Sequence, residues 1–162
     1  MSSQNDRAEA FAALHRRPGA FVIANVWDAG SARIMAGLGF EALATSSGAS
    51  ANSLGRLDGQ VTRDEALAQI RSMANATDLP LSGDLEKGFG DTPEAVATTI
   101  TVAAQAGLVG GSIEDASGDA SRPIYDITLA VERVAAAVAA ARALPFPFVL
   151  TARCENFLRG NP

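Results

Sequence analysis

Short apolar runs rich in β-branched and aromatic residues alternate along the chain with longer stretches in which apolar residues recur at helical spacing. The apolar runs predict strands at residues 21–27, 42–46, 79–85, 110–114 and 146–152. The stretches of helical period predict helices at 31–38, 62–76, 93–106 and 127–144, preceded by an N-terminal helix at about 6–16. A strand, a loop and a helix therefore repeat, and this order predicts a parallel sheet with right-handed crossover connections.

Residues that commonly cap helices support these boundaries. Residues 62–65 and 91–94 each fit a capping box, in which two side chains bond the backbone of the first helical turn. Pro93 suits a first turn because it lacks an N–H group that would have no helical partner there. Asp28 precedes Ala-Gly-Ser and is predicted to cap the helix that follows it.

Polar and charged residues gather at the C-terminal ends of the third, fourth and fifth predicted strands. This is the rim at which (β/α)8 barrels of the TIM type carry their functional groups. No GxGxxG follows the first strand and no GxxxxGK[ST] occurs, so the nucleotide-binding versions of the doubly wound fold lose support. We therefore predict an α/β fold of the TIM-barrel type.

The length of the chain limits how much of such a barrel can be present. A typical barrel takes about 250 residues, whereas the chain has 162. We expect residues 1–162 to form a single partial-barrel domain containing only about the first five β/α units, either as a fragment of a longer protein or as a naturally truncated chain. Its first and fifth strands would then be edges with unpaired backbone groups. The apolar side chains expected to face a partly uncovered interior are Val22, Ala24, Leu43, Leu81, Ile113 and Val149.

Composition excludes several classes of function. The net charge is −5 and the twelve arginines are scattered, so nucleic acid is not an expected partner. One cysteine and one histidine exclude an internal disulfide and a cysteine-based zinc cluster, and they argue against histidine-dependent nucleophile systems and multi-histidine metal sites. No segment resembles a secretion signal or a membrane span, so we expect a soluble cytoplasmic protein without a membrane partner.

Four acidic residues are predicted to converge at the rim of the barrel. Asp84 and Glu86 lie two apart on one predicted strand and so share a face, Glu114 ends the next strand, and Asp58 lies in the loop after the second strand. Carboxylates this close repel one another unless a cation compensates them. A donor set of oxygens alone selects a hard ion, Mg²⁺ or Mn²⁺. The alternative is that these are solvated acids at strand ends.

Basic and hydroxyl groups at the same rim could bind an anionic ligand. Arg153 is the nearby fixed cation, and its planar fork suits the carboxylate of a substrate. Ser46, Ser47 and Gly48 end the second predicted strand and could donate to an oxyanion, although a plain turn explains them equally well. Cys154 follows Arg153 and is expected to be a small packed residue.

Taken together, these segments resemble the isocitrate lyase/phosphoenolpyruvate mutase superfamily. Residues 84–90, Asp-Leu-Glu-Lys-Gly-Phe-Gly, are similar to its acidic D-x-[DE]-x-G-[FY]-G motif. Residues 25–33 look like its opening strand-to-helix segment, and residues 45–49 look like its substrate-binding Ser-Gly turn. Residues 113–115 and 151–153 match its next two strand ends. The resemblance runs along nearly the whole chain.

This resemblance implies a set of roles for the rim residues. Mg²⁺ would be held by Asp84 with Glu86 and Glu114, directly or through water. A small 2-oxo or 2-hydroxy carboxylate would be the substrate, with a 2-oxo acid chelating the metal through its carboxylate and keto oxygens. Ser47 and Gly48 would donate to the substrate, Arg153 would bind it or its enolate, and Asp58 would lie near the reacting atoms. The full-length protein is expected to be a homo-oligomer.

Departures from the family pattern narrow the expected reaction. Lyases for isocitrate and methylisocitrate carry a K-[KR]-C-G-H loop after the fourth strand, whereas residues 116–123 contain no cysteine, lysine or histidine. The segment also lacks the asparagine expected of true mutases. The resemblance then implies a Mg²⁺-dependent lyase or decarboxylase acting through an enolate of pyruvate.

Two alternatives stay open at this point. The chain could be a truncated, catalytically incompetent relative, or a protein that binds 2-oxo acids without turnover. We expect the 162-residue chain by itself not to be a competent monomeric enzyme, because the rim groups of further strands would be missing.

Overall fold

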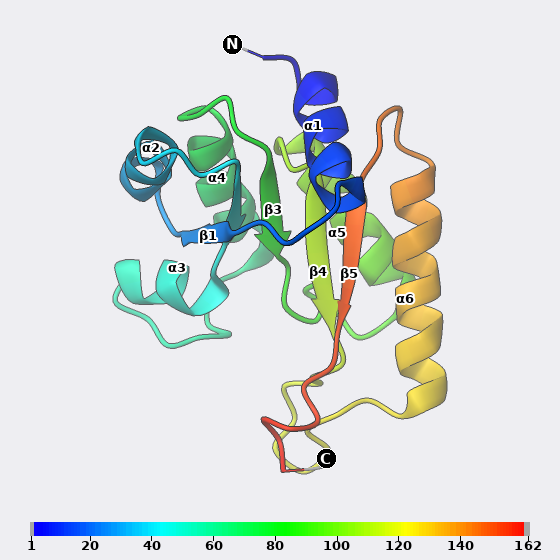
Figure 1. Ribbon diagram of the computed structural model, residues 1–162. Coiled ribbons are helices and arrows are strands. Elements are labelled where there is room, and N and C mark those ends of the chain that lie inside the picture. The colour runs from blue at the N-terminus through cyan, green and yellow to red at the C-terminus, as the bar shows by residue number, and fades with distance from the viewer. Residues whose placement is uncertain (1, 161–162) are drawn as a thin grey trace.

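A five-stranded parallel sheet forms the centre of the structure, a computed structural model that describes residues 2–160 (Figure 1). The strands are β1 (Ile23–Val26), β2 (Ala42–Thr45), β3 (Leu81–Asp84), β4 (Gly110–Glu114) and β5 (Val149–Arg153). They are hydrogen-bonded in the order β1-β2-β3-β4-β5, each parallel to the next. This sheet confirms the predicted parallel α/β arrangement, in which consecutive strands are neighbours as in the first part of a TIM barrel.

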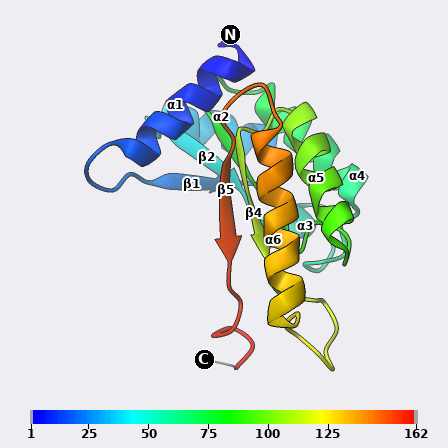
Figure 2. The same cartoon turned by 90° about the vertical axis from the view of Figure 1, so that its right-hand side faces the viewer.

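Six helices accompany the sheet within the described residues. They are α1 (Gln4–Arg16), α2 (Ala29–Gly37), α3 (Ser47–Ser53), α4 (Arg63–Ala74), α5 (Pro93–Gln105) and α6 (Ile127–Arg142). Helices α2, α4, α5 and α6 each lead from one strand to the next, and their apolar residues pack on one face of the sheet (Figure 2). Helix α1 packs through Phe11 against the N-terminal ends of the strands. No helix within residues 2–160 is long and apolar enough to cross a membrane.

The largest apolar side chains of the strands face the helices rather than a barrel interior. Leu43, Leu81 and Ile113 are each at most 1% exposed and share one core with α2, α4, α5 and α6, as does Ala24. The sequence-based assignment of these side chains to the interior is therefore wrong, and Val22 precedes β1 and is exposed. Because strand side chains alternate between faces, the opposite face carries small and polar residues: Asn25, Ala44, Ser82, Ser112 and Thr151. Val149, also on that face, packs near Phe11.

Close contact between the sheet and the segment before β4 requires a glycine in β3. A Cβ atom built on Gly83 would lie 2.4 Å from Leu108 Cδ1 and 3.2 Å from Leu85 Cδ2. Both leucines are fully buried, so neither has room to move aside. Gly83 therefore allows β3 to sit tightly against the core directly before the strand end that carries Asp84.

The helix caps agree with the sequence at two of three predicted positions. Asp28 caps α2 and Thr62 caps α4, each in a reciprocal capping box. The predicted box at 91–94 is wrong, because Thr92 caps α5 and Pro93 occupies its first turn. Asp91 instead binds the side chains of Lys87 and Tyr125. This difference frees Asp91 to connect two loops at the rim.

Candidate active site

A cavity of about 680 Å³ opens at the C-terminal ends of the strands. It brings together side chains from four separate segments of the chain, as predicted for the rim of a barrel. The charged lining residues are Asp58, Glu86, Lys87, Glu114, Asp119, Arg153, Glu155 and Arg159. Ser47 and the segment around 116–123 complete its wall. Acidic groups outnumber basic ones here, so the cavity attracts cations more strongly than anions.

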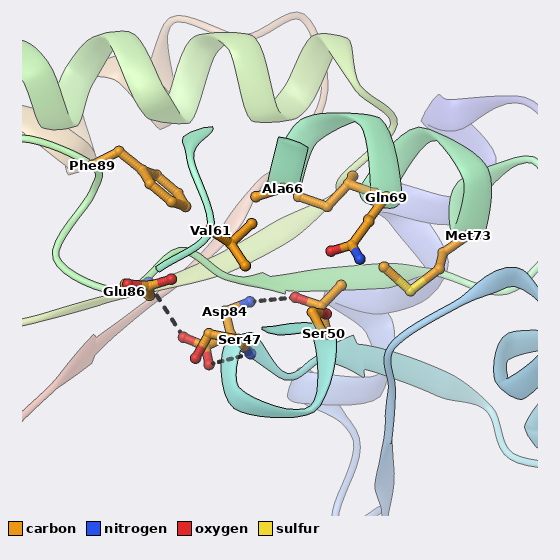
Figure 3. Close-up of a pocket in the computed structure, with 11 residues that line it drawn as sticks. Ser47, Ser50, Val61, Ala66, Gln69, Met73, Asp84, Glu86 and Phe89 are labelled. Atoms are coloured by element: carbon orange, nitrogen blue, oxygen red, sulfur yellow. Dashed lines mark hydrogen bonds between the residues drawn. The ribbon is translucent and has the colours of Figure 1, made fainter. Parts of the chain in front are cut away.

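Asp84 ends β3 and is fixed by the residues around it. Its Oδ2 accepts a hydrogen bond from the Ser47 backbone N–H at 3.0 Å, and its backbone N–H donates to Thr45 Oγ1 at 2.8 Å (Figure 3). Its Oδ1 accepts from the Glu86 N–H at 3.3 Å. Asp84 does not line the large cavity. It lines a smaller one of about 20 Å³, which has room for about one water molecule. Ser47 and Glu86 line both cavities.

Glu86 reaches the cavity from the loop after β3, not from the strand. Strand β3 ends at Asp84, and Glu86 has a left-handed backbone with φ of 50°. The predicted shared strand face for Asp84 and Glu86 is therefore wrong, although both side chains line the same small cavity. A non-glycine residue rarely adopts positive φ and does so mostly at functional or strained sites.

Burial and mutual repulsion perturb two of the carboxyl groups. Burial first, and then the charges of Asp58, Asp84 and Glu114, raise the pKa of Glu86 to about 7. Burial also raises the pKa of Glu114 to about 7; Glu155, Asp84 and Asp58 contribute to this rise, and Arg153 opposes it. Each group thus lies within electrostatic range of the others. The arrangement holds more negative charge than its basic residues neutralise.

Arg153 ends β5 directly opposite Glu114 in the register of the last two strands. Its Nη1 lies 3.7 Å from Asp84 Oδ1, and its Nη2 lies 3.6 Å from Glu114 Oε2. Burial opposes the charged form, but the bond to Glu155 and the charges of Glu114 and Asp84 outweigh it, so the pKa of Arg153 is raised. The terminal nitrogens are beyond ordinary hydrogen-bond distance of these carboxylates, which leaves them able to bind a ligand.

Glu155 is a site residue that sequence reasoning missed. It is 4% exposed and accepts a bond of 2.6 Å from Arg153 Nε, while its own N–H donates to Asp115 Oδ1 at 2.8 Å. A carboxylate this buried requires a charged partner, and here the partner is Arg153. The Arg-x-Glu spacing after a strand was the available signal. Glu155 fixes the plane of the guanidinium and so its direction into the cavity.

Ser47, Gly48 and Asp58 lie together on the β2 side of the cavity. Ser47 begins α3, and its backbone N–H is already used by Asp84. A Cβ atom on Gly48 would lie 3.5 Å from Asp58 Cγ and Oδ2, so the loop carrying Asp58 packs directly against α3. Asp58 Oδ1 accepts from the Gly59 N–H at 3.1 Å. Ser47 and Asp58 line the cavity, whereas Gly48 does not and instead packs next to Asp58.

The oxygen donors of this site fit a hard divalent ion that keeps part of its water shell. Among residues 2–160, no three His, Cys, Asp or Glu side chains are gathered closely enough to hold a metal by themselves. Mg²⁺ commonly binds through one or two carboxylates and several waters. Burial, and after it the repulsion between neighbouring carboxylates, raises the pKa of Glu86 and Glu114, and a bound cation would favour their charged forms. The donor chemistry therefore suits Mg²⁺ or Mn²⁺ bound in part through water.

Comparison with known proteins identifies the family. The family model described as phosphoenolpyruvate phosphomutase matches residues 11–162. The chain belongs to this family. A crystal structure of a candidate lyase/mutase from Burkholderia cenocepacia J2315 is 61% identical, has a TM-score of 0.96, and is matched over 98% of this chain and 57% of that chain.

More distant relatives of this phosphoenolpyruvate mutase family member carry named activities. An oxaloacetate decarboxylase from Chromohalobacter salexigens is 36% identical over 115 residues, 70% of this chain and 40% of that protein. The crystal structure of 2,3-dimethylmalate lyase, a member of the PEP mutase/isocitrate lyase superfamily, is 27% identical with a TM-score of 0.85, covering 97% of this chain and 55% of that one. The predicted superfamily is thus confirmed, and the chain spans about half the length of the relatives it matches.

Proposed function

We propose that this site binds Mg²⁺ or Mn²⁺ together with a small 2-oxo or 2-hydroxy carboxylate and breaks a C–C bond through an enolate of pyruvate. The observation that carries the proposal is the crowding of Asp58, Glu86 and Glu114 around Arg153 in one cavity at the strand ends. Membership of a family whose relatives include an oxaloacetate decarboxylase supports the same reaction class.

Asp84, Glu86 and Glu114 are the residues that would hold the metal. Asp84 is already oriented by Ser47 and by the Glu86 N–H, so it needs little reorganisation to act as a ligand. When bound, the ion would supply positive charge next to the enolate oxygen of the substrate, which lowers the cost of forming that charge. Deprotonation of Glu86 and Glu114 would accompany binding, because ligands bind as carboxylates.

Arg153 and its neighbours would bind and orient the organic substrate. The bond from Nε to Glu155 leaves Nη1 and Nη2 directed at the acidic side of the cavity, where a substrate carboxylate or enolate can accept from both. With oxaloacetate, the C3–C4 bond would break, its electron pair would form the enolate of pyruvate, and CO₂ would leave. C3 would then take up a proton to give pyruvate. Arg153 would stabilise the enolate oxygen throughout.

The loop after β4 favours decarboxylation over the cleavage of isocitrate or methylisocitrate. It contains no cysteine, lysine or histidine at 116–123, and its backbone folds back on itself through the Ser117 N–H to Pro123 carbonyl bond of 2.9 Å. In decarboxylation CO₂ leaves uncharged and takes no proton, and the proton that C3 of the enolate takes up can come from water. A loop without cysteine, lysine or histidine is therefore compatible with oxaloacetate as substrate.

A direct assay tests the proposal. Pyruvate formation from oxaloacetate would be measured with Mg²⁺ and with EDTA, each against a protein-free blank. Metal-dependent turnover at ~1–10³ s⁻¹ is the expected result for a chimera that continues residue 160 with the remaining part of the Burkholderia cenocepacia relative, because that part supplies the rim groups of further strands. In the chimera, Arg153→Lys should reduce this turnover, whereas Arg122→Lys, at an 85% exposed side chain, should not.

The same assay separates the alternatives. Binding of Mg²⁺ and oxalate without turnover in either chain would identify a protein that binds 2-oxo acids. Failure of both chains to bind Mg²⁺ would refute the proposal.

A further inference from the structure

Arg133 on α6 is a buried arginine outside the cavity. It is 1% exposed, and its guanidinium binds no carboxylate in the described residues. Instead it donates to three backbone carbonyls: Nη1 to Gly90 at 2.8 Å and to Asp91, and Nη2 to Lys87. The guanidinium carbon also lies 4.2 Å from the centre of the Tyr125 ring. An arginine is rarely fully buried unless its donors are satisfied, and here the loop after β3 satisfies them.

This loop has an unusual backbone that needs support. Glu86 and Phe89 are the two non-glycine residues with positive φ in the described chain, at 50° and 56°. Such conformations persist where the surroundings over-determine them. The carbonyls that Arg133 binds flank Phe89 on both sides, and Thr99 Oγ1 donates to the Gly88 carbonyl between them at 2.7 Å. Arg133 and Thr99 thus hold the loop from α6 and α5.

The same contacts connect the loop after β3 to the loop after β4. Asp91 Oδ1 accepts from Tyr125 Oη at 2.5 Å and from Lys87 Nζ at 2.7 Å. Lys87 Nζ also donates to the Ser117 carbonyl at 2.7 Å, and Lys87 lines the cavity. Arg133 stacks on Tyr125 and binds the backbone at Lys87 and Asp91, so it contacts three of the four residues of this connection.

We propose that Arg133 is a positioning residue that fixes the loop 86–91 and thereby presents Glu86 to the metal and substrate site. The planar guanidinium reaches carbonyls at both ends of the loop at once, which a point charge cannot do as well. This inference rests on the proposed function for the part that concerns the metal, whereas the fixing of the loop stands by itself.

Two measurements on Arg133→Met and Arg133→Lys test this role, with Arg142→Met as the matched control. Arg142 is an exposed arginine in the last turn of the same helix. The first measurement is amide hydrogen exchange of residues 85–91 in metal-free protein. The second is Mn²⁺ affinity, measured by calorimetry well below the unfolding temperature, so that lost stability alone does not change it.

The expected results differ for each variant. Arg133→Met should exchange at 85–91 at least about tenfold faster and bind Mn²⁺ about 10–100-fold more weakly, as is typical when residues supporting a ligand are removed. Arg133→Lys should show smaller changes than Arg133→Met in both exchange rate and Mn²⁺ affinity, and Arg142→Met should match the wild type in both. If Arg133→Met does not fold, Arg133→Lys is the deciding variant. We then expect its Mn²⁺ affinity to be about threefold or more below that of the wild type.

Two outcomes overturn the inference or separate it from the proposed function. The positioning role would be overturned if Arg133→Met had the exchange rates and the Mn²⁺ affinity of the wild type. If Arg133→Met does not fold, the same result in Arg133→Lys would overturn it. Absence of Mn²⁺ binding in the wild type would refute the proposed function instead, and the exchange rates would still decide whether Arg133 fixes the loop.

Discussion

The stability of the metal-free protein should fall as the pH rises from about 5 to 7.5. Glu86 and Glu114 have pKa values of about 7 in the folded protein, against an ordinary value of 4.5. The folded state therefore binds these protons more tightly than the unfolded state does, and the stability this confers is present at low pH. It is lost as the pH rises through 7, when both groups must ionise beside one another.

The size of the effect follows from the two pKa values. When folding raises the pKa of a carboxyl group from 4.5 to about 7, the free energy of unfolding is about 3.4 kcal/mol higher at low pH than at high pH, at ~1.36 kcal/mol per pKa unit. Solvent reaches both side chains through the open cavity and weakens the effect, so we expect about 1–2 kcal/mol from each. Carboxyls with lowered pKa values act in the opposite direction but at lower pH, as for Glu65 with a pKa of about 2. The window from 5 to 7.5 thus isolates the pair.

Urea unfolding followed by circular dichroism measures this change. The free energy of unfolding would be determined in EDTA across the window for the wild type, for Glu86→Gln with Glu114→Gln, and for Glu132→Gln, an exposed control on α6. The wild type and control should lose about 2–4 kcal/mol, on the discount given above, and the double variant should lose much less. Parallel pH profiles for all three proteins would refute the reasoning that these carboxyl groups are buried beside one another.

Three further predictions concern single residues. Asp84→Ala should abolish Mg²⁺ binding measured by calorimetry, because Asp84 is the acid most firmly oriented at the site; an affinity equal to that of Glu132→Ala would contradict this. Arg153→Lys should weaken oxalate binding about tenfold or more, because lysine cannot make the bidentate contact of arginine, while the affinity for Mg²⁺ stays unchanged. An unchanged affinity for oxalate would refute the substrate-binding role of Arg153. Gly83→Ala should lower the free energy of unfolding by about 1–3 kcal/mol, because the new methyl group overlaps Leu108. A stability within ~0.5 kcal/mol of the wild type would contradict this and show that Leu108 can move aside.

The order of strands and helices could be predicted because each strand is a separate apolar run and each crossover helix has a clear period. Helix α3 was missed, since Ser47–Ser53 is short, rich in serine and alanine, and has no apolar stripe. It forms because Ser46 caps it and because Asp84 binds the Ser47 N–H. Contacts from residues distant in the sequence thus create a helix that local pattern does not specify.

The candidate site residues could be named from the sequence, but their backbone and supports could not. Glu86 lies on a left-handed loop rather than on a strand, and alternation along a predicted strand contains no signal for such a turn. Glu155 and Arg133 are themselves buried and bind partners 2 to 46 residues away in the sequence. Spacing alone cannot distinguish such buried charges from exposed ones, because burial depends on how α6 and β5 pack.

Joint binding of metal and carboxylate at this site is tested by calorimetric titration of oxalate into the protein with and without Mg²⁺. Oxalate is a planar dianion that resembles the enolate of pyruvate, so a site built for that enolate should bind it through the metal and Arg153. We predict that oxalate binds at least about 100-fold more tightly in Mg²⁺ than in EDTA, which corresponds to ~2.7 kcal/mol. Equal affinity under the two conditions, or no binding in either, would contradict it.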